Sequence, residues 1–382
     1  MRHILVLLHR YVGLALAVPL IVAGLGGAVI AFQHEIDAAL NPSFHHVADN
    51  GLALTPSDLV ARIEAQLPDA EVVFMPLDRH AGRTVRTYVL ARDSARPLEF
   101  DEVAADPATG AIVGQRLWGK ASIAPEDIVS FIYRLHLSLA LGDVGTWIMG
   151  IAAVIWLLDN FVALVLTLPR RWPWWPRWAK SWRVKTSAGA HRKVFDIHRA
   201  GGLWPWLLLL IVACSSIQMN LPEQVFRPVV ASFAALSPIP SPAVPPSEPI
   251  LERLGWDEAV KRARAEAIQL GWPDSGGWMQ WDRESRTYRF CQCSLDPNAV
   301  DFGARRELRV GARTGDVTVL REPSKRTAAD VFVDLQYPLH TGRLGGFAGR
   351  IVVCVIGLAV AALAISGVWL FLRRRRVQAA GT

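Results

Sequence analysis

Four long apolar segments constrain the fold of this chain more than any other feature of its sequence. They contain no charged residue and span Tyr11–Phe32, Val144–Leu158, Ala200–Pro222 and Ile351–Leu372. A helix rises about 1.5 Å per residue, so each segment comes close to the roughly 20 residues that cross the hydrocarbon core of a bilayer. The sequence therefore predicts four transmembrane helices and excludes a soluble enzyme. We expect the first helix to remain, because no signal-peptide cleavage site follows it.

Basic residues indicate which side of the membrane each loop occupies. They gather at Arg2 and Arg10, in 169–199 together with five tryptophans, and at Arg373–Arg376. Because cytoplasmic loops are rich in Lys and Arg, we expect both termini and this loop in the cytoplasm of a bacterium, with the chain in its inner membrane. The net charge of +7 then reflects membrane topology, and no nucleic acid is expected as a partner.

The predicted order of segments follows from these two patterns. It runs through transmembrane helix 1 (1–32), a first periplasmic module (33–143), transmembrane helix 2 (144–168), a basic Trp-rich cytoplasmic loop (169–199), transmembrane helix 3 (200–222), a linker with a second periplasmic module (223–350), transmembrane helix 4 (351–372) and a cytoplasmic tail (373–382).

Each periplasmic segment has the pattern of one helix followed by short alternating strands. The first has a helix at 54–67, capped by Ser57, and strands at 71–74, 84–90 and 98–104. The second has a helix at 256–270 and strands at 277–281, 287–293 and 307–310. Gly-containing turns at 106–110 and 313–316 close the two segments, and a proline-rich linker at 237–249 precedes the second. Each segment is therefore predicted to be a small α+β module, a helix on an antiparallel sheet.

Two histidine motifs occur twice at constant spacing. The motif Leu/Ile-His-Arg-x-x-Gly-Leu contains His9 and recurs 189 residues later at His198; we call these the HR motifs. The motif Tyr-x-Leu-His-x5-Gly-x-x-Gly contains His136 and recurs 204 residues later at His340; we call these the YLH motifs. The chain is thus predicted to duplicate helix, module and helix. Because helices 1 and 3 run in the same direction, we expect a parallel repeat about a twofold axis along the membrane normal.

The repeat places the four histidines at two depths. His9 and His198 (the HR pair) fall at the cytoplasmic ends of their helices, and His136 and His340 (the YLH pair) fall at the outer ends. A twofold axis that passes between two histidines opposes their imidazoles, as in the axial ligation of a six-coordinate haem. A structural zinc ion needs its four ligands together, whereas these pairs lie far apart. With no C-x-x-C-H in the sequence, we predict two haem b groups whose iron is held by the HR and YLH pairs, the YLH pair being catalytic.

Neighbouring residues complete this prediction. Arg10 and Arg199 follow the HR histidines and are predicted to bind haem propionates. The glycines of both motifs are expected to let helices approach the flat macrocycle, although G-x-x-G is also a helix-packing pattern. His191 and His34 stand as substitutes for a proposed ligand, and polar histidines at the membrane interface stand as the alternative to ligation.

The order of helix, strands and Asp-Pro-x-Thr-Gly turn in the first module resembles a PepSY module. Nearly the whole chain is similar to the PepSY-associated transmembrane-helix family of iron-regulated membrane proteins, and within it to inner-membrane reductases of ferric hydroxamate siderophores such as ferrioxamine. The resemblance implies an oxidoreductase that reduces a periplasmic ferric siderophore for iron acquisition. Reduction would release the iron, because hard oxygen ligands bind Fe(II) more weakly than Fe(III).

The electrons are expected to come from another molecule. The loop 169–199 is too short to fold a flavin or nicotinamide domain, so a quinol or a cytoplasmic reductase is the predicted donor. The competing interpretation is a non-enzymatic PepSY membrane protein that binds a periplasmic peptide, peptidase or siderophore, with structural histidines.

Three further residues stay open to more than one interpretation. Asp159, an acid within a transmembrane helix, is placed to hydrogen-bond a haem ligand, to carry a proton or to pair with Arg170. Cys291 and Cys293 form a C-x-C in an oxidising compartment, where a disulfide or a redox pair is conceivable. We favour the interpretation that they are two small residues of a strand.

Overall fold

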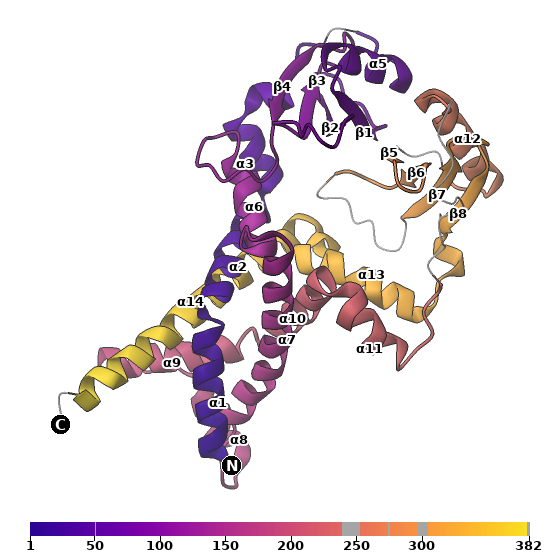
Figure 1. Ribbon diagram of the computed structural model, residues 1–382. Coiled ribbons are helices and arrows are strands. Elements are labelled where there is room, and N and C mark those ends of the chain that lie inside the picture. The colour runs from indigo at the N-terminus through magenta and orange to yellow at the C-terminus, as the bar shows by residue number, and fades with distance from the viewer. Residues whose placement is uncertain (50, 239–252, 274–275, 297–304, 380–382) are drawn as a thin grey trace. The chain divides into compact units, whose positions relative to one another are not determined.

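The computed structural model describes residues 1–49, 51–238, 253–273, 276–296 and 305–379 and divides into two units (Figure 1). Unit 1 comprises 1–33, 131–234 and 332–382, and unit 2 comprises 34–130 and 235–331. All four predicted transmembrane segments fall in unit 1. The predicted helices and strands of both modules fall in unit 2, whereas 131–143, 223–234 and 332–350, which the prediction counted with the modules, belong to unit 1. The predicted proline-rich linker lies outside the described residues, apart from its first two.

Unit 1 is helical. Its helices are α1 (Arg2–Ala15), α2 (Ala17–Ile30), α6 (Ile128–Ser138), α7 (Gly142–Thr167), α8 (Trp174–Trp178), α9 (Ala190–Leu203), α10 (Trp206–Asn220), α11 (Arg227–Ala231), α13 (Ala328–Thr341) and α14 (Gly346–Ala379), with short turns η1 (Ala179–Trp182), η2 (Pro222–Phe226) and η4 (Arg343–Gly345). Two helices of the described residues, α7 and α14, are long and apolar enough to cross a membrane. The number rises to four if α1 with α2 and α9 with α10 each count as one bent span. The protein is therefore a membrane protein with two to four candidate spans.

The first and third predicted transmembrane helices are bent at equivalent positions. The bend is 59° between α1 and α2 and 66° between α9 and α10. Pro19 lies in the first turn of α2, and Pro205 directly precedes α10. Proline lacks an N–H, and its ring clashes with the carbonyl four residues earlier, so each interrupts the helical hydrogen bonds. The break residues Leu16 and Pro205 are 189 residues apart, so the bends follow the spacing of the HR motifs.

Helix contacts in unit 1 have the twofold pattern that the duplication predicts. Helix α2 packs on α14, and its counterpart α10 packs on α7. Likewise, α1 packs on α7, and its counterpart α9 packs on α14. The α2–α14 crossing is closest at two glycines: a Cβ on Gly24 would lie 2.5 Å from the carbonyl oxygen of Gly357. The corresponding residues of the α10–α7 crossing, Ala213 and Ala153, are both buried.

The glycines of the YLH motifs form tight backbone turns between helices. The first glycine of each motif takes a positive φ, 59° at Gly142 and 56° at Gly346. The second, Gly145 or Gly349, touches the backbone just before it, so a Cβ on Gly145 would lie 1.7 Å from the carbonyl oxygen of Ser138. Gly145 and Gly349 therefore have the helix-packing role that was the alternative, and room for a macrocycle beside these four glycines stays a prediction.

Unit 2 contains one antiparallel sheet of eight strands in the order β4-β3-β2-β1-β5-β6-β7-β8. The strands are β1 (Ala70–Pro76), β2 (Val85–Ala91), β3 (Glu102–Ala105), β4 (Ile112–Arg116), β5 (Gly277–Asp282), β6 (Thr287–Gln292), β7 (Arg306–Gly311) and β8 (Val317–Arg321), and the helices are α3 (Gln33–Leu40), α4 (Pro42–His45), α5 (Pro56–Gln66) and α12 (Trp256–Gln269), with a short η3 (Pro323–Lys325). The last strand of each half, β4 or β8, follows the predicted closing turn and is absent from the sequence prediction.

The two predicted modules share this sheet. Strands β1 and β5 pair antiparallel, with Met75 opposite Met279, and so join the two four-stranded halves edge to edge. The starts of α5 and α12 are joined as well: the amide of Asp257 donates to the Ser57 hydroxyl at 2.9 Å, and the amide of Ser57 donates to the Asp257 carboxylate at 3.0 Å. Ser57 is therefore not the cap of its own helix. That role belongs to Thr55, whose hydroxyl accepts from the amide of Asp58.

Candidate cofactor site

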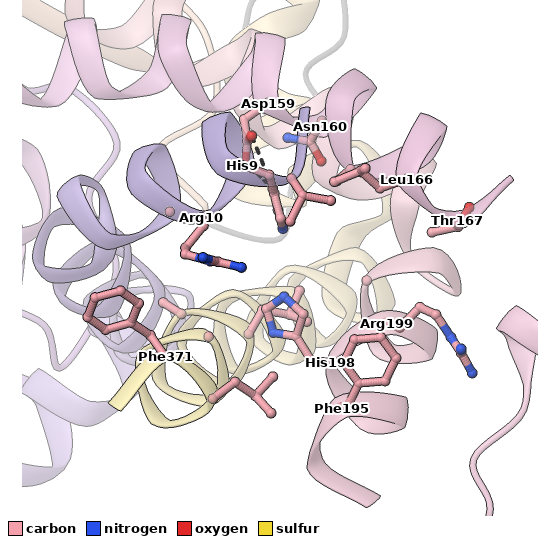
Figure 2. A pocket seen from close by; sticks show the side chains of 18 of the residues that line it. His9, Arg10, Asp159, Asn160, Leu166, Thr167, Phe195, His198, Arg199 and Phe371 are labelled. Carbon is pink, nitrogen blue, oxygen red and sulfur yellow. Dashed lines mark hydrogen bonds and ion pairs between the residues drawn. The ribbon is translucent and has the colours of Figure 1, made fainter. Parts of the chain in front are cut away.

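The imidazole rings of the HR pair lie close together in the structure. His9 lies on α1 and His198 on α9, each seven residues before the bend of its helix. The centres of their rings are 6.2 Å apart, with 59° between the ring planes. Figure 2 shows both side chains entering the same pocket from opposite helices. The pairing predicted from the repeat is thus the one that the fold produces.

The YLH pair meets in the same way. His136 on α6 and His340 on α13 have ring centres 6.0 Å apart, with an interplanar angle of 58°. Helix α2 leaves room for one of these rings at a glycine, because a Cβ on Gly27 would lie 3.0 Å from Cε1 of His136.

The two pairs lie at different levels of unit 1. His198 contacts α14 at Gly367, whereas Gly357, ten residues earlier on α14, meets α2 at Gly24. Gly24 is one turn from Gly27, the contact of His136. At about 1.5 Å per residue, ten residues of helix separate the levels by about 15 Å.

All four histidines use Nδ1 for a hydrogen bond within unit 1. The partners are the Asp159 carboxylate for His9 (2.9 and 3.1 Å), the Ser366 hydroxyl for His198 (2.9 Å), the Ala23 carbonyl for His136 (2.9 Å) and the Ser215 hydroxyl for His340 (3.0 Å). These partners determine which ring nitrogen carries the proton. A carbonyl or a carboxylate only accepts a hydrogen bond, so Nδ1 of His136 and His9 must donate. The two serine hydroxyls donate to main-chain carbonyls, so they accept from His198 and His340.

With the proton on Nδ1, each Nε2 keeps its lone pair. Metal-bound histidines in proteins have this arrangement, in which the other ring nitrogen donates to a neighbouring acceptor. Two imidazoles bonded to one iron from opposite faces have ring centres about 6 Å apart, since each metal–nitrogen bond is about 2.0 Å and each ring centre lies about 1.1 Å beyond its nitrogen. Both observed separations match this value. The residues therefore fit two bis-histidine iron centres.

A cavity of about 1040 Å³ surrounds the HR pair. Its volume exceeds what one metal ion needs and suits a large organic cofactor. Gly13 and Gly202, the glycines of the HR motifs, lie in its wall, and a Cβ on Gly13 would meet no atom within 4 Å. These two glycines thus keep the place beside the cavity that the sequence predicts for them.

The two predicted propionate ligands differ in their surroundings. Figure 2 shows the guanidinium of Arg10 between α1 and α14, inside the pocket, and that of Arg199 directed away from His198. Arg199 donates to Asp196 at 2.8 Å and to main-chain carbonyls of the Trp-rich loop, including that of Lys180. Arg10 is therefore the better placed of the two to bind an anionic group in the pocket, whereas Arg199 holds the loop against α9.

Of the two substitute ligands, one lines the HR cavity and the other lies in unit 2. His191 lines the same cavity, and its ring faces Trp369 at 6.3 Å. His34 is on α3, in unit 2. Across the part of the chain that the structure describes, no three or more His, Cys, Asp or Glu side chains form a cluster able to hold a metal ion. Among the described residues, the candidate iron ligands are therefore the two histidine pairs.

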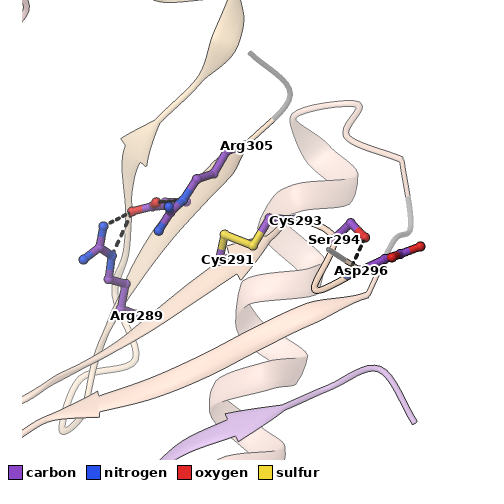
Figure 3. The surroundings of a disulfide bond; sticks show 7 residues. Arg289, Cys291, Cys293, Ser294, Asp296 and Arg305 are labelled. Atoms are coloured by element: carbon purple, nitrogen blue, oxygen red, sulfur yellow. Dashed lines mark hydrogen bonds and ion pairs between the residues drawn. A yellow bond between two sulfur atoms is a disulfide. The ribbon is translucent and has the colours of Figure 1, made fainter. Parts of the chain in front are cut away.

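Cys291 and Cys293 form a disulfide at the end of β6 (Figure 3). The favoured interpretation, two small residues of a strand, is therefore wrong, and the disulfide alternative is the one that the structure shows. Cys291 lies between Trp278 of β5 and Glu307 of β7 in the sheet, and Arg289 donates to Glu307 at 2.8 Å. Cys214 and Cys354 are free thiols, half-buried in α10 and α14.

Sequence reasoning missed three of the four histidine partners. Asp159 stands out as an acid in an apolar helix, whereas Ser215, Ser366 and the Ala23 carbonyl are ordinary features of apolar helices. They carry no signal of their own in the sequence, because their role depends on which histidine the helix pairing places beside them.

Comparison with known proteins finds one family over nearly the whole chain. The family model described as the PepSY-associated TM region matches residues 6–374, a range that contains both HR and both YLH motifs. Among curated proteins, none matches the chain.

Proposed function

The chain belongs to the PepSY-associated TM region family, and we propose that it is a di-haem membrane reductase that passes electrons to a ferric siderophore. The observation that carries the proposal is the pair of opposed imidazoles repeated at two levels, with ring centres 6.2 and 6.0 Å apart and every Nδ1 hydrogen-bonded. The competing role, non-enzymatic binding by the modules, gives no reason for this geometry.

Haem of the b type suits these residues. The sequence has no C-x-x-C-H for covalent attachment, so the histidine pairs would hold the iron alone, with Arg10 near a propionate. Bound there, haem supplies one-electron transfer between Fe(II) and Fe(III). The chain's own contribution is to orient the imidazoles through Asp159, the two serines and the Ala23 carbonyl, and to exclude water with the apolar walls of unit 1.

The proposed reaction is balanced by single electrons. One electron converts one siderophore-bound Fe(III) into Fe(II), which the hard oxygen ligands then hold weakly. The donor is a quinol or a separate reductase, because 169–199 holds no nucleotide-binding domain. The siderophore class is inferred from the resemblance to hydroxamate siderophore reductases.

The proposed placement follows from charge. Arg2, Arg10 and Arg373 lie at the end of unit 1 that holds the HR pair, which would face the cytoplasm of a bacterium. The YLH pair would then lie near the periplasmic face of the inner membrane, on the side of the substrate. Electrons would enter at the HR pair and leave at the YLH pair.

The test uses the purified full chain in detergent. We expect red protein whose Soret band shifts with dithionite and which holds about two haems per chain. Anaerobic reduced protein, freed of dithionite, should then be reoxidised by a ferric hydroxamate siderophore, with Fe(II) trapped by ferrozine. The gallium complex of the same siderophore has the same shape and charge but accepts no electron, so it should leave the protein reduced. A chain that stays colourless after incubation with haem would contradict the proposal and leave the non-enzymatic role.

A further inference from the structure

The hydrogen-bond partners of the four histidines are not equivalent. Three partners are neutral: the Ala23 carbonyl and the hydroxyls of Ser215 and Ser366. The fourth is the Asp159 carboxylate, on Nδ1 of His9. The duplication that pairs the histidines does not repeat this acid, because the residue 204 positions after Asp159 is Leu363. One charged partner therefore distinguishes the HR pair from the YLH pair.

We propose that Asp159 makes the iron site of the HR pair harder to reduce than that of the YLH pair, and so gives electron transfer its direction. The inference rests on the proposed function, since it concerns haem iron held by these residues. Asp159 is a positioning residue: it contacts His9 and not the iron.

The charge of Asp159 acts on the iron site through the His9 ring. A carboxylate that accepts the Nδ1–H of an imidazole makes the ring more basic and a stronger electron donor. A stronger donor stabilises Fe(III) more than Fe(II), as does a negative charge near the iron. Both effects lower the reduction potential. Hydroxyl and carbonyl acceptors carry no net charge and act more weakly.

The arginines that line the HR pocket would raise the reduction potential of its iron site, but pairing or solvent weakens the effect of several of them. The Arg199 guanidinium is paired with Asp196 at 2.8 Å, and Arg373 is exposed. Arg10 would be paired with a propionate in the loaded protein. The side chain of Asp159 is only 10% exposed and lies 2.9 Å from the ligand ring, so its charge is poorly screened. Asp159 is thus a buried, poorly screened charge in direct hydrogen-bond contact with a ligand ring.

This asymmetry has a functional consequence. An electron that enters at the HR pair would move to a site of higher potential at the YLH pair, so transfer towards the substrate is downhill. The duplicated fold by itself gives two similar sites and no preferred direction.

The experiment is a redox titration of the haem-loaded full chain, followed by absorbance. His340→Ala leaves the HR site alone, and His198→Ala leaves the YLH site alone, so each midpoint potential is read separately. We expect the HR site to have the lower midpoint. In the His340→Ala background, Asp159→Asn keeps an acceptor for His9 and removes its charge, and should raise the midpoint by about 59 mV or more, a tenfold change in the one-electron equilibrium. Ser366→Ala in the same background removes the neutral partner of His198 and should change the midpoint potential of the HR site less than Asp159→Asn does.

Each outcome decides the inference. The inference is wrong if the HR site has a higher midpoint potential than the YLH site. It is also wrong if Asp159→Asn retains haem and leaves the midpoint potential of the HR site unchanged. In both cases the di-haem function stands. If the wild-type chain binds no haem, the proposed function itself fails. The comparison of the two single-histidine variants needs no change at Asp159, so it remains decisive even if Asp159→Asn does not fold.

Discussion

His136 and His340 face each other with ring centres 6.0 Å apart, although each enters unit 1 on a helix that follows a different half of the sheet. His136 is on α6, after β4, and His340 is on α13, after β8. The two halves of the duplicated chain thus each contribute one imidazole to each pair. Neither half can form a pair by itself.

Replacement of one YLH histidine should therefore remove one haem and spare the other. We expect His136→Ala to lower the haem content from about two to about one per chain in a pyridine haemochrome assay, because His340 alone holds iron weakly. His191→Ala is the control, since His191 lines the HR cavity without an opposed imidazole. Loss of both haems in His136→Ala, or of one in His191→Ala, would count against the pairing.

A glycine beside the YLH pair offers a steric test. A Cβ on Gly27 would lie 3.0 Å from Cε1 of His136, so Gly27→Val should push the ring out of line and cost the YLH haem. Gly189→Val is the matched control, because a Cβ there meets no atom within 4 Å and Gly189 does not line the pocket of the HR pair. Spectra of the two variants should differ accordingly, and equal haem content in both would show that His136 tolerates the added side chain.

A buried ion cluster in unit 2 should control acid stability. Arg116 donates to Asp37 at 2.9 and 3.0 Å and to Glu102 at 2.7 Å, and all three side chains are buried. Although burial of the Asp37 carboxyl opposes its ionisation, hydrogen bonds from His45 and Arg116 prevail and hold its pKa well below the ordinary value of 3.8. A lowered folded-state pKa stabilises the fold above the unfolded value, and this stability is lost as the pH falls below about 4.

Asp37→Asn tests this cluster directly. Removal of one partner from a buried ion pair costs about 3–5 kcal/mol, because the other charge is left uncompensated. The variant should therefore unfold at lower denaturant concentration at pH 7, and its stability should fall less than that of wild type between pH 5 and pH 3. Asp93→Asn is the control, since Asp93 is exposed and its ion pair with Arg96, at 3.7 Å, lies at the surface. An unchanged acid dependence in Asp37→Asn would refute the assignment.

The disulfide of unit 2 should contribute little to stability. It joins residues two apart, and the entropy removed from the unfolded chain grows with loop length, so closing so short a loop gives only about 1.5 kcal/mol. The double variant Cys291→Ser with Cys293→Ser should thus stay folded, with a modest decrease in the midpoint of chemical unfolding. A loss above about 4 kcal/mol would show that the bond does more than close this loop.

The sequence alone determined the elements whose signals are local. Apolar length marks the transmembrane segments, and the HR and YLH motifs mark the duplication and the four histidines. The pairing of His9 with His198 and of His136 with His340 was also accessible, because a repeat of constant spacing implies a symmetry axis, and an axis brings equivalent residues together.

Only the tertiary structure decided the features that depend on contacts between distant segments. Asp159 hydrogen-bonds His9 from 150 positions away, a contact that agrees with the first of the three interpretations that the sequence left open. The edge-to-edge pairing of β1 with β5 merges the two modules, because an exposed strand edge carries unpaired backbone groups that another strand can satisfy. Hydrogen-bond partners such as Ser215 and Ser366 have no sequence signature, since a hydroxyl in an apolar helix acquires a role only from the side chain that the fold places beside it.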